Sequence, residues 1–179
     1  MIQRIQSLFL LITGLLLITF LFVPIWENTN KTVEKNGKIT EGRAVLNAFN
    51  VKYSAVEKIV VKTEFNSIIK EKEVHEERGT PYIAILAIIV LLSTFYSIFQ
   101  YKRRSLQIKL GLLNSLLLSA LLGCIFLGIR QGNSWLPLPQ DGEFLAGFFV
   151  PILCILFNMT ANRYIKKDED LVRSADRMR

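Results

Sequence analysis

Side chains that could support chemistry are sparse in this 179-residue chain, and His75 is its single histidine. It stands next to Glu76 and two residues after Glu73. An imidazole flanked by carboxylates can bind a metal weakly, but no second histidine and no cysteine at ligand spacing completes the set. We therefore expect a solvated charged segment here and no metal site.

The two cysteines, Cys124 and Cys154, both fall inside apolar runs. A nucleophilic cysteine needs a base beside it, and neither has one nearby in sequence. If the runs are antiparallel helices, the two residues differ in depth by about 7 Å, so a disulfide would need a favourable tilt. We expect two buried small apolar residues. The chain also has no His-Glu-x-x-His, Gly-x-Ser-x-Gly or phosphate-loop motif, so we expect no catalytic residue, no cofactor and no enzyme activity.

Asn114 and Asn158 are polar residues that fall at similar depth in two different apolar runs. Amides at one depth in neighbouring helices favour a hydrogen-bonded clamp between the helices. A polar substrate or lipid-headgroup site is the alternative, and Pro151 would loosen the helix that carries Asn158. The runs themselves contain no Asp, Glu, His, Lys or Arg, the groups that usually mark ion pathways, so the clamp is favoured.

Four apolar runs must position these residues, and each is close to the roughly 20 residues that cross a bilayer. Because 51% of the chain is hydrophobic and these residues are gathered into blocks, we expect spans rather than a soluble core. The predicted fold is an all-α membrane protein, a four-transmembrane-helix bundle with a small antiparallel β-sheet formed by the first extracytoplasmic loop. The predicted spans are 7–26, 81–99, 110–129 and 144–161. The segments between and beyond them are a cytoplasmic N-terminus 1–6, an extracytoplasmic β-rich domain 27–80, a cytoplasmic basic turn 100–109, an extracytoplasmic loop 130–143 and a charged cytoplasmic tail helix 162–179.

The distribution of charge predicts the orientation of these spans. The turn 100–109 holds Lys102, Arg103, Arg104 and Lys109 without an acid, so the positive-inside rule places it in the cytoplasm. The inner side then carries the whole net charge of +7, which argues for a membrane protein and against a nucleic-acid partner. The first run ends without a small-residue cleavage pattern, so we expect an uncleaved signal-anchor with the N-terminus inside. We expect Trp26 at its end to be an interfacial anchor.

The first outer loop carries strand signals. Asn36-Gly37 is a strong hairpin signal, because both residues tolerate the positive φ of a type I′ turn. Period-2 alternation predicts half-buried strands, one of them with a single face formed by Val45, Asn47, Phe49, Val51 and Tyr53. About fifty residues make a small core, so the sheet should rest its apolar face on the outer ends of the helices. Segment 68–74 fits either a strand or a charged helical lead.

The third apolar run contains a ridge of small residues at every fourth position, namely Gly111, Ser115, Ser119 and Gly123. Such ridges let helices approach closely in lipid. Packing within the bundle, with Ser93 and Ser97 as natural contacts, is the favoured interpretation. The alternative is contact with a second copy or with a partner subunit.

The inner side also combines opposite charges. The acids Asp168, Glu169 and Asp170 of the tail could meet the cations Lys102, Arg103 and Arg104 of the turn. A solvated helix with i,i+4 pairs, among them Glu169 with Arg173, is the favoured interpretation. Docking of the tail onto the basic turn, or onto a partner, is the alternative.

Three stretches together resemble a known family: residues 1–8 (MIQRIQSL), 101–110 (YKRRSLQIKL) and 161–179 (ANRYIKKDEDLVRSADRMR). They are similar to the Bacteroidota membrane proteins catalogued as domain-of-unknown-function family 4293, and the resemblance spans the whole chain. It implies a multi-pass protein of the bacterial inner membrane with four helices, and it brings no reaction, substrate or site residue.

The sequence therefore predicts a non-enzymatic accessory or structural subunit of a membrane complex. We expect its partners to be membrane lipids and either a protein partner or further copies of the chain. A small carrier, or a lipid- or small-molecule-handling protein that acts as an oligomer, is the alternative.

Overall fold

The computed structural model describes residues 2–33, 38–63, 66–101, 103–134 and 142–177. The chain is mostly helical and carries a small antiparallel sheet, as predicted. The helices are α1 (Ile2–Phe20), α2 (Pro81–Phe99), α3 (Arg104–Asn133) and α4 (Ala146–Arg177). The strands are β1 (Trp26–Val33), β2 (Lys38–Leu46), β3 (Asn50–Thr63), β4 (Asn66–Gly79) and β5 (Glu143–Phe144). By length and composition α2, α3 and α4 could each cross a membrane, whereas the apolar part of α1, Ile5–Phe20, is shorter.

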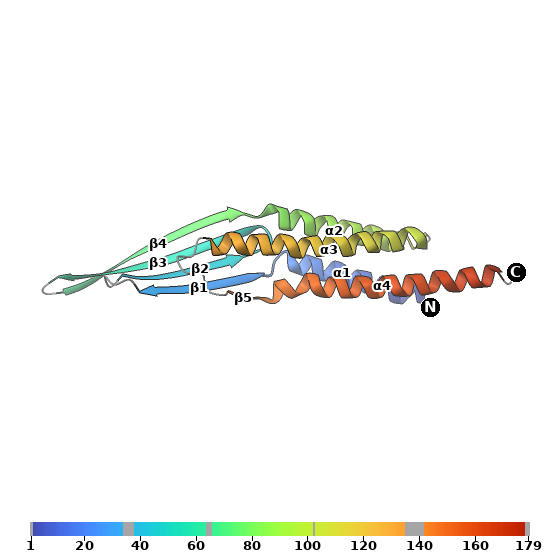
Figure 1. Ribbon diagram of the computed structural model, residues 1–179, viewed down its shortest axis with the longest axis horizontal. Helices are drawn as coiled ribbons and strands as arrows, with labels where there is room; N and C mark the ends of the chain where they lie inside the picture. The colour runs from blue at the N-terminus through green and yellow to red at the C-terminus, as the bar shows by residue number, and fades with distance from the viewer. Residues whose placement is uncertain (1, 34–37, 64–65, 102, 135–141, 178–179) are drawn as a thin grey trace.

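The four helices form a closed bundle, because α1 and α3 each pack against both α2 and α4. The sheet extends from one end of this bundle, and the hairpin of β3 and β4 reaches furthest (Figure 1). Both chain termini lie at the opposite end, where α4 continues past the other helices (Figure 1). We call these the sheet end and the tail end of the bundle.

The helix boundaries confirm some of the predicted ranges and correct others. Helix α2 has the predicted bounds, and α4 continues through the tail as one helix. The helix formed by the first apolar run ends at Phe20, well before Trp26, and Pro24 lies in the connection that follows. Helix α3 begins at Arg104, so most of the predicted basic turn is the first part of that helix.

The sheet has the strand order β4-β3-β2-β1-β5, and all its pairs are antiparallel. Segment 68–74, left open by the sequence, belongs to strand β4. Strand β5 (Glu143–Phe144) lies where the predicted loop 130–143 meets the predicted span 144–161, and it pairs with the start of β1, so the sheet is not formed by the segment 27–80 alone. The predicted Asn36-Gly37 turn lies outside the described residues.

The prediction that residues 45–53 form one strand with a single face is wrong, because this stretch contains a turn. The backbone N–H of Asn47 donates to the carbonyl of Asn50 at 2.8 Å, which closes a hairpin between β2 and β3. Residues that continue the same alternation therefore lie on opposite faces of the sheet before and after the turn. The side chains that are fully buried are Ala44, Leu46, Ala48 and Val51, whereas Phe49 is 47% exposed.

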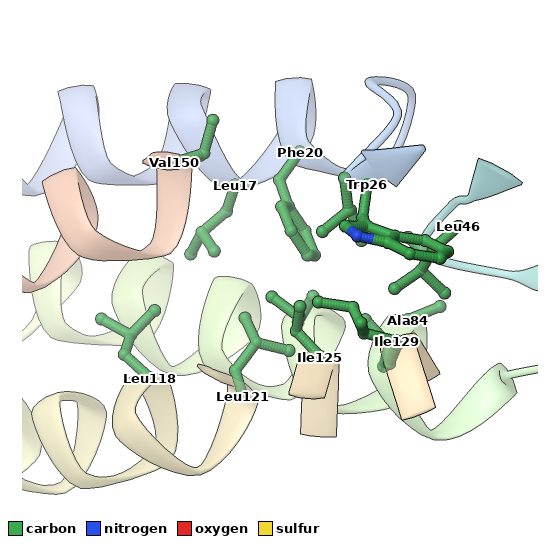
Figure 2. Packing of buried hydrophobic residues seen from close by; sticks show 14 of the residues in the cluster. Leu17, Phe20, Trp26, Leu46, Ala84, Leu118, Leu121, Ile125, Ile129 and Val150 are labelled. Carbon is green, nitrogen blue, oxygen red and sulfur yellow. The ribbon is translucent and has the colours of Figure 1, made fainter. Parts of the chain in front are cut away.

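The sheet and the helices share one apolar core at the sheet end, as expected. Its largest fully buried side chain is Trp26, which is 1% exposed and packs among residues of the strands and of α3 (Figure 2). A Cβ at Gly132 would lie 2.9 Å from the indole ring, and a Cβ at Gly142 would lie 2.5 Å from it. Trp26 is thus a buried core residue, which corrects its predicted place at the membrane interface.

The start of α4 is attached to the same region by backbone hydrogen bonds. The N–H of Leu145 donates to the carbonyl of Ile25 at 3.0 Å, and that of Gly147 donates to Pro24 at 3.1 Å. A Cβ at Gly147 would lie 2.6 Å from the Pro24 oxygen, so only glycine fits there without a shift. The connection between α1 and β1 therefore also fixes where α4 begins.

The glycine contacts give a matched test of this shared core. We expect Gly132→Ala to lower the free energy of unfolding by about 1 to 3 kcal/mol, because the new methyl overpacks the ring of Trp26. Gly123→Ala is the control, since a Cβ at Gly123 has no atom within 4 Å and alanine favours the helix. Chemical unfolding in mild detergent, followed by circular dichroism, measures both. Equal effects of the two variants would contradict the packing described here.

Candidate functional site at the tail end of the bundle

The small-residue ridge of α3 divides between two surroundings. Gly111 is buried and Ser115 half-buried against α4, whereas Ser119 and Gly123 are exposed. The reason is geometric, because each step of four residues advances roughly 40° beyond a full turn of 3.6 residues. Over the length of the ridge this displaces Gly123 by roughly 120° from Gly111. Only the first half of the ridge can therefore face one neighbour.

Asn158 of α4 binds that half of the ridge. Its Nδ2 donates to the backbone carbonyl of Gly111 at 2.7 Å and to the Ser115 hydroxyl at 2.9 Å. Asn162, one turn further, takes the space that a side chain at Gly111 would fill. The ridge thus packs on α4 rather than on the serines of α2 that the sequence favoured.

Asn114 turns to the other neighbour of α3. Its Nδ2 donates to the Thr94 hydroxyl of α2 at 3.3 Å, and Thr94 in turn donates to its own helix at Val90. Both asparagines are almost fully buried. They act in two separate contacts, one to each side of α3, which favours the interhelical clamp over a shared polar site.

Two glutamines extend this set of polar contacts, and the sequence analysis missed both. Gln6 of α1 donates to the carbonyl of Tyr164 on α4 at 3.1 Å, and Gln107 of α3 donates to the carbonyl of Ser97 on α2 at 3.2 Å. Each glutamine side chain is at most 4% exposed. The sequence does indicate Gln107 indirectly, because it lies seven residues before Asn114 and both therefore share one helix face.

The charged residues of the turn and the tail meet as the second interpretation proposed. Arg104, at the start of α3, forms an ion pair with Asp168 of α4 at 3.0 Å. The predicted i,i+4 pair of Glu169 with Arg173 is also present, at 2.8 Å. Arg103 and Asp170 are exposed, and Lys102 lies outside the described residues. The tail part of α4 is therefore joined to α3 on the face that carries Asp168 and is exposed on the face that carries Asp170.

Two hollows follow the contact between α3 and α4 at this end. The first, of about 720 Å³, is lined by Tyr101, Arg103, Arg104, Ser105, Leu106, Lys109 and Glu169. The second, of about 400 Å³, is lined by Ile108, Leu112, Ser115, Met159, Asn162, Arg163 and Lys166. We call the second one the α3–α4 groove. It joins an apolar part to a cationic part.

The other candidate chemical groups remain separate from this end of the bundle. His75 is exposed on strand β4, 3.4 Å from a carboxylate oxygen of Glu73. Over the described residues no group of three His, Cys, Asp or Glu side chains could hold a metal ion. Cys124 and Cys154 are free thiols, and Cys154 is buried with its Sγ 3.8 Å from the Thr13 carbonyl of α1.

Comparison with known proteins assigns the chain to a family. A family model described as "Domain of unknown function (DUF4293)" matches residues 2–178 of the chain. A search of the curated proteins gave no match.

The contact between Asn158 and the ridge makes a prediction about stability. Asn158→Leu removes two hydrogen bonds to α3, and interhelical hydrogen bonds of this kind contribute about 0.6 kcal/mol each on average. We expect the free energy of unfolding to fall by about 1 to 2 kcal/mol. Thr160→Ala, on the same helix, is the control because Thr160 donates only to its own helix at Leu156. If the two variants unfold at the same denaturant concentration, Asn158 does not clamp the helices.

Proposed function

This chain belongs to the family described as domain of unknown function (DUF4293), and we propose that it is a non-enzymatic accessory or structural subunit of a membrane complex. In this proposal the chain crosses the inner membrane of a bacterium four times. The tail end faces the cytoplasm with both termini, and the sheet stands on the extracytoplasmic side.

Besides α2, α3 and α4, this proposal counts α1 as a membrane span, and the surface of α1 supports that assignment. One side of α1 is fully buried at Leu10, Leu17 and Phe20. The opposite side exposes large apolar residues, with Leu8 and Leu15 each 55% exposed. A helix that is apolar on both sides fits a position between a packed bundle and lipid. It also packs along α2 and α4, which are long enough to span.

Charge supports the proposed orientation. Exposed cations at the tail end include Arg103, Lys109, Arg163 and Lys166. Short cytoplasmic segments are rich in Lys and Arg, so the tail end is the inner one. The sheet then lies outside, and its edge strand β4 exposes the charged residues 73 and 76–78 together with His75. Charged edges discourage indiscriminate strand pairing and leave polar side chains for specific contacts.

The filled interior of the bundle is the observation that carries the proposal of a non-transporting subunit. Leu17 and Phe20 of α1 and Leu118, Leu121 and Ile125 of α3 have no exposed surface and meet along the bundle axis (Figure 2). A solute path through a bundle needs polar groups or water along it. An apolar packed interior instead suits a scaffold that holds an outer domain in a fixed place. A lipid- or small-molecule-handling role is the second candidate, favoured by the α3–α4 groove.

We expect extraction of the tagged native protein in mild detergent, followed by native mass spectrometry, to recover a stoichiometric protein partner. We propose that the partner contacts the exposed edge strand β4. A Glu76→Lys variant should therefore lose the partner, because it reverses a charge on that strand. Asp170→Lys in the tail makes the same change in net charge and should retain the partner. A strictly monomeric protein that retains no other protein would overturn the proposed function.

A further inference from the structure

The α3–α4 groove has an apolar part, and two cations lie at one end of it. Leu112 and Met159, which line its apolar part, are 63% and 45% exposed. Arg163 and Lys166 lie at its other end, and both are exposed. Met159 and Lys166 are about 10 Å apart along the axis of α4 at 1.5 Å per residue. The described residues that line the groove include no acid, and in the neighbouring hollow these two cations and Lys167 stand against the single acid Asp170.

The position of the groove along the helices coincides with a boundary in polarity. Arg163 is the first charged residue of α4, and Lys109 is the last charged residue of α3 before its long apolar part. In a membrane-spanning bundle these residues mark the level of the lipid headgroups. The groove therefore runs from the hydrocarbon region into the headgroup region, on the side that carries the excess of cations.

We propose that the α3–α4 groove binds one anionic phospholipid of the inner leaflet. Its phosphate lies between Arg163 and Lys166, and an acyl chain covers Ile108, Leu112 and Met159. Basic pockets between helices on the cytoplasmic side suit anionic headgroups, and the apolar part of the groove suits an acyl chain. Charge complementarity selects an anionic over a zwitterionic lipid, while the apolar wall selects a lipid over free phosphate.

The lipid would also strengthen the contact between α3 and α4. Its two cationic partners are on α4, whereas Ile108 and Leu112 of the apolar wall are on α3. The groove floor is formed by Ser115 and Asn162, which belong to the same helix contact as the Asn158 clamp. A lipid that bridges both helices binds the packed bundle only, so it stabilises that bundle.

Native mass spectrometry of the full chain tests this site, with phosphatidylglycerol, phosphatidylcholine or inorganic phosphate added to the micelles. We expect phosphatidylglycerol to bind most tightly and phosphate alone not to displace it. Arg163→Gln with Lys166→Gln should weaken its binding about 30-fold, which is about 2 kcal/mol at 1.4 kcal/mol per factor of ten. Lys167→Gln with Arg173→Gln removes the same charge outside the groove lining and should change binding less than about 3-fold.

A third variant, Leu112→Trp, fills the apolar part of the groove without a change in charge, and it should weaken lipid binding while the protein stays folded. Equal binding of the two lipids, equal effects of the two double variants, or displacement by phosphate would each overturn the lipid site. The inference rests on the proposed membrane-spanning arrangement. A chain recovered outside the membrane fraction would overturn that arrangement, whereas a membrane-bound chain without lipid preference would overturn only the site.

Discussion

The burial of Trp26 is the contact on which the rest of the structure depends. Its indole lies between the sheet and α3, where Gly132 and Gly142 leave room for the ring. Because Trp26 is also the first residue of β1, it pairs with Leu46 of β2 and with Phe144 of β5. The residues just before it bind the start of α4. The short stretch that ends at Trp26 thus joins the sheet, the first helix and the last helix.

At the other end of the bundle, polar contacts replace this large apolar contact. Gln6, Gln107, Asn114 and Asn158 each donate a hydrogen bond to a neighbouring helix. Hydrogen bonds of this kind are suited to an apolar environment, where burial alone does not distinguish helix from lipid. The ion pair between Arg104 and Asp168 continues the same contact into the tail. The bundle is therefore held by packing at the sheet end and by directional bonds at the tail end.

The sequence was informative where structure is local and less so where distant residues decide it. The bounds of α2 and the helical tail follow from apolar runs and helix-forming composition, and the structure confirms both. Strand β5 has only two residues and exists because β1 is beside it, so no local pattern could indicate it. Trp26 was expected at the interface because indoles prefer that position. Two glycines distant in sequence create its buried site instead. The sequence indicated Asn114 and Asn158 as candidates for a helix clamp, but their partners depend on the rotation of α3 and α4, which spacing alone does not fix.

The central claim is that the bundle crosses a membrane with the sheet outside and the tail inside. Single cysteines in a variant with Cys124 and Cys154 replaced by alanine test it, one at exposed Glu76 on β4 and one at exposed Asp170 on α4. The measurement is labelling by a membrane-impermeant maleimide, on spheroplasts and then on lysed cells. We predict that Glu76→Cys reacts in intact spheroplasts and that Asp170→Cys reacts only after lysis. Labelling of Asp170→Cys before lysis, or protection of Glu76→Cys until lysis, would contradict the claim.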